Sequence, residues 1–156
     1  MSQDPSWDEL AKMHEEFQER METKYPKMFS KPYGGMAIGA GWFDLVETLC
    51  SLIQGRIDSR YKQHTYSVTN NLKIVPATKQ VVVAQVKEKF GGLRFYYDGG
   101  DEYIAGLVDM TETMSYNICE ECGDRGERRG GGWIQTLCDK HEAERQERIA
   151  KRSKEA

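Results

Sequence analysis

Four residues near the C-terminus are spaced as the ligands of one metal ion. Cys119 and Cys122 form a C-x-x-C pair followed by Gly123, and Cys138 and His141 form a C-x-x-H pair. Two intervening residues allow a tight turn to aim both side chains at the same ion, and Gly123 allows the positive φ that such a turn commonly adopts. Three thiolates and one imidazole are a standard tetrahedral zinc set. The sequence therefore predicts a zinc site, and this site constrains the fold more than any other feature.

The same ligand set indicates a structural rather than a catalytic ion. Four protein ligands complete a tetrahedron and leave no open position for water. A disulfide or a thioredoxin-like redox pair would leave one of the three cysteines unpaired and would not explain His141. The combined pattern of base deaminases, an H-x-E motif with a separate P-C-x-x-C motif, is absent, and residues 123–137 contain neither the histidine nor the asparagine that treble-clef nucleases need. We therefore expect structural Zn²⁺, no catalytic residues, and a binding protein rather than an enzyme.

The segment between the two ligand pairs predicts a short hairpin that leads into a helix. Arg128, Arg129 and Trp133 flank three glycines, and residues 134–137 alternate between apolar and polar side chains. With a helix that starts at the second ligand pair, this order resembles a treble-clef zinc finger. The two arginines and the indole offer charge and a stacking surface to an anion or a nucleic acid, although acidic residues in the same segment offset that charge.

Residues 80–97 predict a β-hairpin with one apolar and one cationic face. Gly91 and Gly92 suit a two-residue turn, which would place Lys89 opposite Arg94. The alternation of side chains then gathers four candidate ligand-binding residues on one face, namely Lys87, Lys89, Arg94 and Tyr96. The opposite, core-facing side would hold Val82, Ala84, Val86, Phe90, Leu93, Phe95 and Tyr97.

The cationic side of this hairpin leaves two interpretations open. Like charges directly opposite each other on a sheet cost stability, and a phosphate, a nucleotide or an acidic partner surface would offset that cost. Plain solvent around the basic side chains would offset it as well. Trp42, which follows the Gly-rich loop 34–41, is a further candidate for ligand binding because helix N-termini bind anions. The loop lacks the Lys-Ser/Thr pair of a P-loop.

Apolar residues at helical spacing flank the hairpin region. Ser6 and Glu9 fit a capping box for a first helix, which ends before Pro26. Its apolar stripe suits packing on the core or on another subunit, so an oligomer formed through this N-terminal helix is an open prediction. Two further helices are expected over residues 42–61 and 102–118, and short strands over residues 66–69 and 73–75.

Together these patterns predict an α+β fold. It consists of a small antiparallel sheet with a β-hairpin, packed by amphipathic helices, and a C-terminal treble-clef-like zinc finger. We expect the α+β core with the N-terminal helix in residues 1–118, and the zinc-finger module with a charged C-terminal helix in residues 119–156. Cys50 is remote from the other cysteines and is expected to be a small packing residue of the core.

The charge and the apolar runs exclude some classes of partner. The chain of 156 residues has 22 basic and 25 acidic side chains and a net charge of −3, which excludes a histone-like protein that binds DNA over its whole surface. Its longest apolar runs are only a few residues, and its start carries no apolar signal-peptide core. We therefore expect a cytoplasmic protein without a membrane partner.

Several motifs occur together in one known group of proteins. They are K-Y-P at residues 24–26, G-W-F-D at 41–44, V-K-E-K-F-G-G-L-R-F-Y-Y at 86–97, C-x-x-C-G at 119–123 and T-L-C-D-K-H at 136–141. In these motifs the chain resembles an uncharacterised family of small bacteriophage and bacterial proteins. The resemblance implies a phage or prophage setting, the cytoplasm of the host cell, and an accessory role that acts on host machinery or host defence.

Three functional hypotheses follow from these features. The first is a non-enzymatic binding protein that uses the cationic side of the hairpin to sequester an anionic, nucleotide-type ligand or to block a host defence protein. The second is a nucleic-acid-binding zinc-finger protein, whose affinity would fall steeply as salt rises. The third is a hydrolase of nucleotides or nucleic acid, for which His14 and His64 are the only histidines outside the predicted zinc site.

Overall fold

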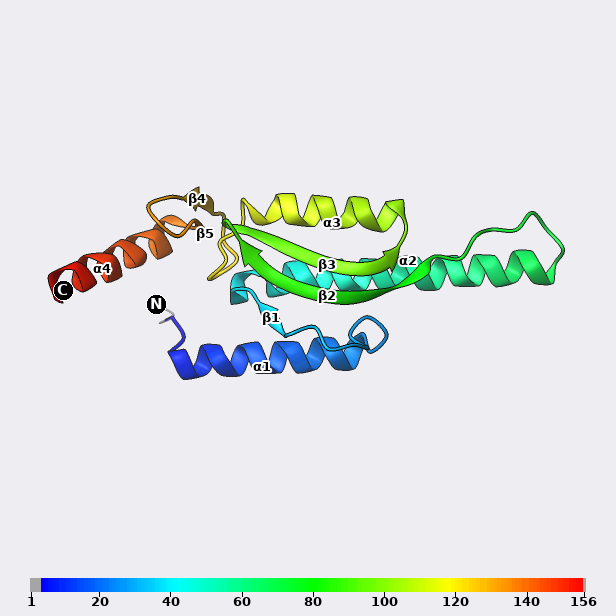
Figure 1. Cartoon of the computed structure of the whole chain (residues 1–156), viewed down its shortest axis with the longest axis horizontal. Helices are drawn as coiled ribbons and strands as arrows, with labels where there is room; N and C mark the ends of the chain where they lie inside the picture. Colours follow the sequence, from blue (N-terminus) through cyan, green and yellow to red (C-terminus); the bar gives the residue numbers. More distant parts are fainter. Residues whose placement is uncertain (1–3, 156) are drawn as a thin grey trace.

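The computed structural model describes residues 4–155, which form two sheets and four α-helices in an α+β fold (Figure 1). The elements are α1 (Trp7–Lys24), β1 (Met36–Ala37), the 3-10 helix η1 (Ala40–Trp42), α2 (Phe43–Thr69), β2 (Lys79–Lys89), β3 (Gly92–Gly100), α3 (Glu102–Ser115), β4 (Glu127–Arg129), β5 (Gln135–Leu137) and α4 (Asp139–Glu155). The larger sheet has the order β1-β2-β3, and β4 and β5 form the second. Because β1 pairs parallel with β2, the larger sheet is mixed and not purely antiparallel as predicted.

Helix α1 begins and ends where the sequence predicts. The Glu9 amide donates to Ser6 Oγ at 3.3 Å, and the Ser6 amide donates to the Glu9 carboxylate at 2.7 Å, which completes the capping box. Phe17 and Met21 are buried in the core, whereas Trp7 is 82% exposed. Trp7 and Met13 in the N-terminal half of the apolar stripe are thus exposed, and their role in an oligomer stays a prediction.

Helix α2 is longer than the sequence predicts. Residues 66–69 are its last turn and not a strand, and residues 73–75 form no strand either. Side chains of the helix hold the segment that follows: the Val75 amide donates to Ser67 Oγ at 3.1 Å, and the Val75 carbonyl lies 2.7 Å from His64 Nδ1. These contacts satisfy backbone groups that a strand would pair in a ladder. Figure 1 shows this end of α2 projecting beyond the sheet.

The turn between β2 and β3 lies one residue earlier than predicted. Phe90 and Gly91 occupy its two central positions with positive φ angles of 54° and 78°, which is typical of a type I′ turn. Lys87, and not Lys89, therefore lies opposite Arg94. Because moving the turn by one residue shifts the pairing by two, each side chain near the turn keeps its predicted face.

A β-bulge in β2 changes which side chains of this strand face the core. On the part of β2 that precedes the bulge, they differ from the predicted ones. Val83 and Gln85 pair with successive residues of β3, so Ala84 is an extra residue in β2. The bulge reverses the alternation, and Val82 and Ala84 therefore do not face the core. Phe90 is 61% exposed, contrary to the prediction, because the turn removes it from the ladder. The buried hairpin side chains include Val81, Val83, Val86, Leu93 and Phe95.

Helix α3 covers the outer edge of β3. The Leu93 amide donates to Ser115 Oγ at 2.9 Å, and the Phe95 amide donates to the Glu112 carboxylate at 2.9 Å. These side chains satisfy edge amides that would otherwise offer a template for another strand. The helix ends before residues 116–118, which were expected to belong to it and instead form a turn toward the ligand segment.

The core joins the sheet to the first three helices. Trp42 is fully buried, and its indole Nε1 donates to the carbonyl of Ile118 at 2.8 Å. Cys50 is also fully buried, as predicted for a packing residue, and burial raises the pKa of its thiol well above the ordinary value.

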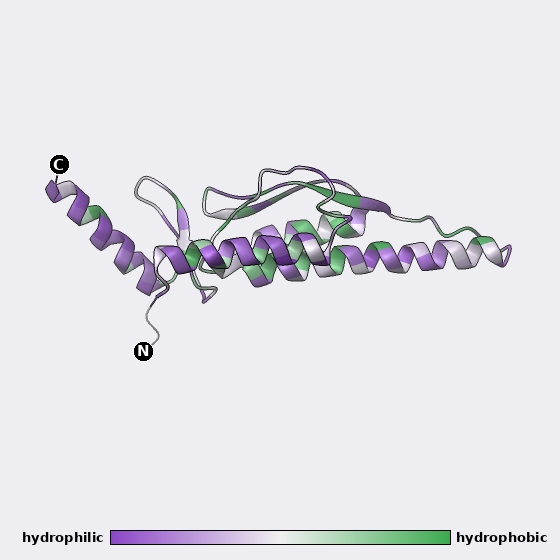
Figure 2. Cartoon of the chain, turned by 90° about the horizontal axis from the view of Figure 1, so that it is seen from below, coloured by the Kyte–Doolittle hydropathy of each residue, from purple (hydrophilic) through white to green (hydrophobic). Residues whose placement is uncertain are grey.

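The C-terminal helix α4 differs from the other helices in composition. It is hydrophilic along nearly its whole length (Figure 2). Only His141 and Arg145 of this helix are buried among the residues that the structure describes. Within residues 4–155, no helix is both long and apolar enough to cross a membrane.

Replacing Phe90 with asparagine should stabilise the protein. A bulky side chain in the left-handed region is strained by roughly 1–2 kcal/mol, whereas asparagine tolerates this backbone conformation and Asn-Gly is a favoured type I′ pair. Because the Phe90 ring is mostly exposed, the substitution removes little packing. We expect the free energy of unfolding, measured by urea denaturation, to rise by about 1 kcal/mol.

Tyr96→Asn is the matched control for this turn substitution. Tyr96 is another exposed aromatic residue of the hairpin, but its φ lies in the ordinary strand region. Asparagine there should lower the free energy of unfolding, since it has a poor strand propensity. Equal losses of stability for Phe90→Asn and Tyr96→Asn would contradict strain at the turn.

Candidate metal centre

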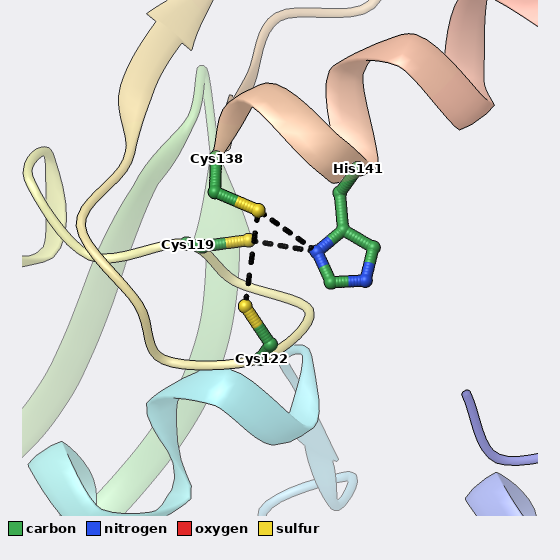
Figure 3. Close-up of side chains that lie close together, drawn as sticks. All are labelled: Cys119, Cys122, Cys138 and His141. Atoms are coloured by element: carbon green, nitrogen blue, oxygen red, sulfur yellow. Dashed lines mark hydrogen bonds between the residues drawn. The ribbon is translucent and has the colours of Figure 1, made fainter. Parts of the chain in front are cut away.

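Three cysteines and one histidine converge where the β4–β5 hairpin meets α4 (Figure 3). His141 Nδ1 lies 3.4 Å from Cys119 Sγ and 3.2 Å from Cys138 Sγ. The Sγ atoms of Cys122 and Cys138 are 3.9 Å apart. A tetrahedral zinc ion with bonds of about 2.0–2.3 Å requires ligand atoms roughly 3.3–3.8 Å apart. The four predicted ligands thus lie close together and could hold one metal ion.

Backbone hydrogen bonds shape the two ligand pairs. In the first pair, the Gly123 amide donates to the Cys119 carbonyl at 2.9 Å, and Gly123 adopts a φ of 83°, as the sequence predicts. In the second pair, the Glu142 amide donates to the Cys138 carbonyl at 2.9 Å in the first turn of α4. Residues three apart share one side of a helix, so Cys138, which directly precedes α4, and His141 in its first turn lie on the same side.

The second ring nitrogen of His141 points away from the sulfurs and toward two carboxylates. Nε2 lies 3.8 Å from Asp4 Oδ1 and 4.0 Å from Glu144 Oε2. Asp4 also accepts a hydrogen bond from Lys140 Nζ at 2.7 Å, which lowers the pKa of its carboxyl group. Carboxylates beside the free nitrogen orient a metal-bound imidazole and raise its basicity.

The Cys122 thiol favours the protonated form when no cation is bound. Burial raises the pKa of Cys122 to about 12; a backbone hydrogen bond at Asp124 opposes this shift, and the neighbouring thiols Cys119 and Cys138 add to it. A divalent metal ion reverses the balance, because it binds thiolates and releases their protons. All four cysteines are free thiols in the described chain, so the cluster has the donors that a soft divalent ion needs.

Two glycines of the Gly-rich loop 34–41 pack directly on the first ligand pair. A Cβ atom at Gly41 would lie 2.1 Å from the carbonyl oxygen of Cys119, and one at Gly39 would lie 2.0 Å from that of Glu120. The Gly41 amide donates to the Glu120 carbonyl at 2.9 Å. Close packing on the ligand segment therefore accounts for these glycines without a bound anion.

One arginine of the C-terminal module lies next to the predicted cationic residues of the hairpin. Arg94 Nη2 donates to the Tyr116 hydroxyl at 2.7 Å, and the guanidinium carbon of Arg128 lies 5.0 Å from the centre of the same ring. Lys87 Nζ lies 5.9 Å from the ring centre of Tyr96. We call this surface the cationic face; it consists of the cations Lys87, Lys89, Arg94 and Arg128 and the rings of Phe90, Tyr96 and Tyr116.

Tyr116 is a member of the cationic face that no sequence pattern predicts. It directly follows α3, and its ring contacts both Arg94 and Arg128. A Cβ atom at Gly92 would lie 2.6 Å from this ring, so the glycine makes room for it. No local pattern marks Tyr116, because only the tertiary structure brings the two arginines to its ring.

The remaining candidate ligand-binding residues lie elsewhere. Trp42 is enclosed in the core and does not reach the surface. Arg129 donates to the Asp139 carboxylate at 2.6 Å. Trp133 is 71% exposed and lines a pocket with several acidic residues. Of these candidates, only Arg128 joins the hairpin residues.

This acidic pocket adjoins the metal ligands. Glu120 lines it, and burial raises the pKa of the Glu120 carboxyl group to about 7. A hydrogen bond from Gln135 opposes this shift, whereas the nearby carboxylates of Glu88 and Glu121 add to it. The pocket therefore concentrates negative charge beside the metal centre.

Comparison with known proteins does not assign this site. No protein-family model matches the chain, and no curated protein and no solved structure matches it either. Function is therefore inferred from the geometry of the metal cluster and the cationic face.

Removing one ligand should abolish metal binding. Cys138→Ser leaves three ligands, and a hydroxyl is a poor substitute for a soft thiolate. We expect the wild-type protein to carry about one equivalent of zinc, measured by inductively coupled plasma mass spectrometry, and Cys138→Ser to carry almost none after dialysis. Cys50→Ala is the control and should keep its metal, because that thiol lies in the core. Full zinc content in Cys138→Ser would contradict the four-ligand site.

A methyl group at Gly41 should destabilise the protein and weaken its hold on the metal. It would collide with the backbone of the ligand segment, and such overpacking costs about 1–3 kcal/mol. Gly55→Ala is the control, because Gly55 lies in α2 with no heavy atom within 4 Å of an added Cβ. That change should stabilise the helix by roughly 0.5–1 kcal/mol. Thermal unfolding and zinc competition with a chelator measure both effects, and equal behaviour of the two variants would refute the packing argument.

Proposed function

We propose that the protein is a non-enzymatic binding protein in which a structural zinc ion supports a cationic face for an anionic, nucleotide-type ligand. The observation that carries this proposal is the gathering of four cations around three aromatic rings. Among the described residues, none of the four forms an ion pair within 4.0 Å. An anionic ligand would supply the missing charge.

The donor set supports zinc as the metal and a structural role for it. Three thiolates and one imidazole suit Zn²⁺ and leave no open position for catalysis. The chain order of ligand turn, β4–β5 hairpin and ligand-bearing α4 supports a treble-clef-like arrangement. Bound zinc would join both ends of the hairpin and so limit its motion.

The pairing of the strands supports anion binding. Lys87 lies directly opposite Arg94, and like charges in this position are destabilising. Glu112 is the carboxylate whose negative charge acts on Arg94. One of its oxygens, however, accepts a hydrogen bond from the Phe95 amide. The charge repulsion is therefore not neutralised by an ion pair of the described chain.

The chemistry of the cationic face suits a nucleotide. Guanidinium groups match phosphate oxygens in bidentate geometry, and exposed rings offer surfaces for base stacking. Phe90 and Tyr96 are 61% and 42% exposed. A ligand with both phosphates and a base would use both kinds of group.

The C-terminal module, residues 119–156, would contribute one of the cations that bind the anion. Arg128 lies on β4, within the module, and its guanidinium donates to the Phe90 carbonyl at 3.1 Å. Fixing β4 by the metal therefore fixes Arg128 beside the hairpin. This contact supports a coupling in which loss of zinc weakens anion binding.

The resemblance of the motifs to small bacteriophage proteins supports a biological role for such binding. A protein that sequesters a signalling nucleotide would deprive a host defence protein of its activator. Blocking a host protein directly through the same face is the other form of this proposal.

Removing two cations of the face should weaken binding of a nucleotide. We expect Lys87→Ala with Arg128→Ala to raise the Kd for ATP, measured by isothermal titration calorimetry, by at least about tenfold, because each charged hydrogen bond contributes roughly 1.5–3 kcal/mol. Lys62→Ala with Lys73→Ala removes the same charge from exposed positions outside the face and should leave the Kd unchanged. Zinc content confirms that both proteins are folded.

Several outcomes would contradict the proposal. An unchanged Kd in the first double variant would exclude the cationic face as the site. Tight binding of a single-stranded oligonucleotide with a steep salt dependence, and none of ATP, would favour a nucleic-acid-binding protein. Hydrolysis of ATP that persists through independent purifications would favour an enzyme.

A further inference from the structure

The acidic pocket lined by Glu120 and Trp133 lies between the ligand segment and the larger sheet, and its charge is opposite to that of the cationic face. It has a volume of about 470 Å³, and its acidic lining residues are Glu88, Glu120 and Glu121. Met36 and Ile38 add apolar surface, and the indole of Trp133 lines it as well. None of the lining residues in the described chain is a lysine or an arginine, and burial lowers the pKa of His14, the one histidine that lines the pocket. The pocket therefore combines carboxylates with an apolar and aromatic wall.

Glu120 has an unused acceptor although it is buried. Its side chain is 6% exposed, and one carboxylate oxygen accepts from Gln135 Nε2. The other oxygen, Oε2, is buried without a hydrogen-bond partner among residues 4–155. Buried carboxylate oxygens are rarely left without a donor, so this atom has an unused capacity to accept a hydrogen bond. Arg145 acts on Glu120 through its charge, but in the described chain it donates to Glu142, Gly130 and Trp133 instead.

The other two carboxylates form no ion pair within 4.0 Å among the described residues, although the charge of Glu121 acts on His14. One oxygen of Glu88 accepts from the Gly91 amide at 2.7 Å, which leaves its second oxygen available. Glu121 is exposed, and the described residues offer it no ion pair within 4.0 Å. A positively charged ligand would offer hydrogen-bond donors to these free carboxylate oxygens.

The spacing of the groups favours an organic cation over a metal ion. Two clusters of the described residues bring three or more metal-ligating atoms within 4.8 Å of one another, and both include His141. The pocket carboxylates form no such cluster. A planar guanidinium carries five N–H donors in a fixed fork and stacks on indole rings.

We infer that this pocket binds a guanidinium group, which donates to the carboxylates of Glu120 and its acidic neighbours and stacks on the indole of Trp133. The ligand is a small guanidine compound or an arginine side chain of a polypeptide. This site shares no residue with the cationic face, so it stands whether or not the anion is a nucleotide.

Two probes of the same shape but different charge test this inference on the zinc-loaded protein. N-acetyl-arginine amide is titrated by calorimetry, with the indole signal of Trp133 followed by NMR, and N-acetyl-citrulline amide serves as the neutral probe of the same shape. We expect the arginine probe to bind at least about tenfold more tightly, because a charge-assisted bidentate contact is lost in citrulline. Equal affinities for the two probes would overturn the inference.

Variants locate the binding to the pocket. Glu120→Gln should weaken the arginine probe at least about tenfold, whereas Glu147→Gln, an exposed position on α4, should leave its Kd unchanged. Glu88→Gln with Glu121→Gln provides an independent test from two other positions and should also weaken binding. Zinc content shows whether each variant keeps the metal centre. Unchanged affinity of the folded Glu120→Gln or Glu88→Gln/Glu121→Gln variants for the arginine probe would overturn the inference. Displacement of the probe by millimolar Mg²⁺ would overturn it as well.

A final comparison distinguishes the two sources of the guanidinium. Ethylguanidinium represents a small compound, and a capped Gly-Gly-Arg-Gly-Gly peptide represents a polypeptide. Tighter binding of the peptide would identify an arginine side chain of a partner protein, and equal binding would identify a small guanidine as sufficient.

Discussion

The close contact between the Gly-rich loop and the first ligand pair determines how the two parts of the chain are arranged. The Gly41 amide donates to the Glu120 carbonyl, and the indole of Trp42 donates to the carbonyl of Ile118, just before the first ligand. No side chain fits between the two backbones at Gly39 or Gly41. The metal-ligating segment is thereby held against the core, and the positions of the cationic face and the acidic pocket depend on this contact.

The alternation of side chains along β2 distributes opposite charges onto two sides of one hairpin. Lys87 and Lys89 point to one side of the strand and Glu88 to the other. The C-terminal module completes each surface, with Arg128 joining the lysines and Glu120 lying in the same pocket as Glu88. The net charge of −3, which sums 22 basic and 25 acidic side chains over the whole chain, does not reveal these two oppositely charged surfaces.

Sequence patterns were reliable where a single local interaction decides the structure, and failed where distant groups compete. The capping box at Ser6 depends on residues three apart. The hairpin turn instead accepts strain at Phe90, because this register pairs Val86 with Phe95 in the core and lets Glu88 accept from the Gly91 amide. Two adjacent glycines made the later turn the simpler prediction, and no local rule weighs these longer-range gains against the strain.

The sequence by itself determined the four residues that could hold a metal ion, the hairpin and the side of β2 on which the lysines lie. These features follow from spacings of two or three residues, which backbone geometry converts directly into direction. Only the tertiary structure decided that Trp42 is enclosed, that Tyr116 joins two arginines, and that a glutamate beside a metal ligand is buried with an unused oxygen. Those outcomes depend on packing between segments far apart in the chain, where burial and shape complementarity outweigh the conformational preferences of neighbouring residues.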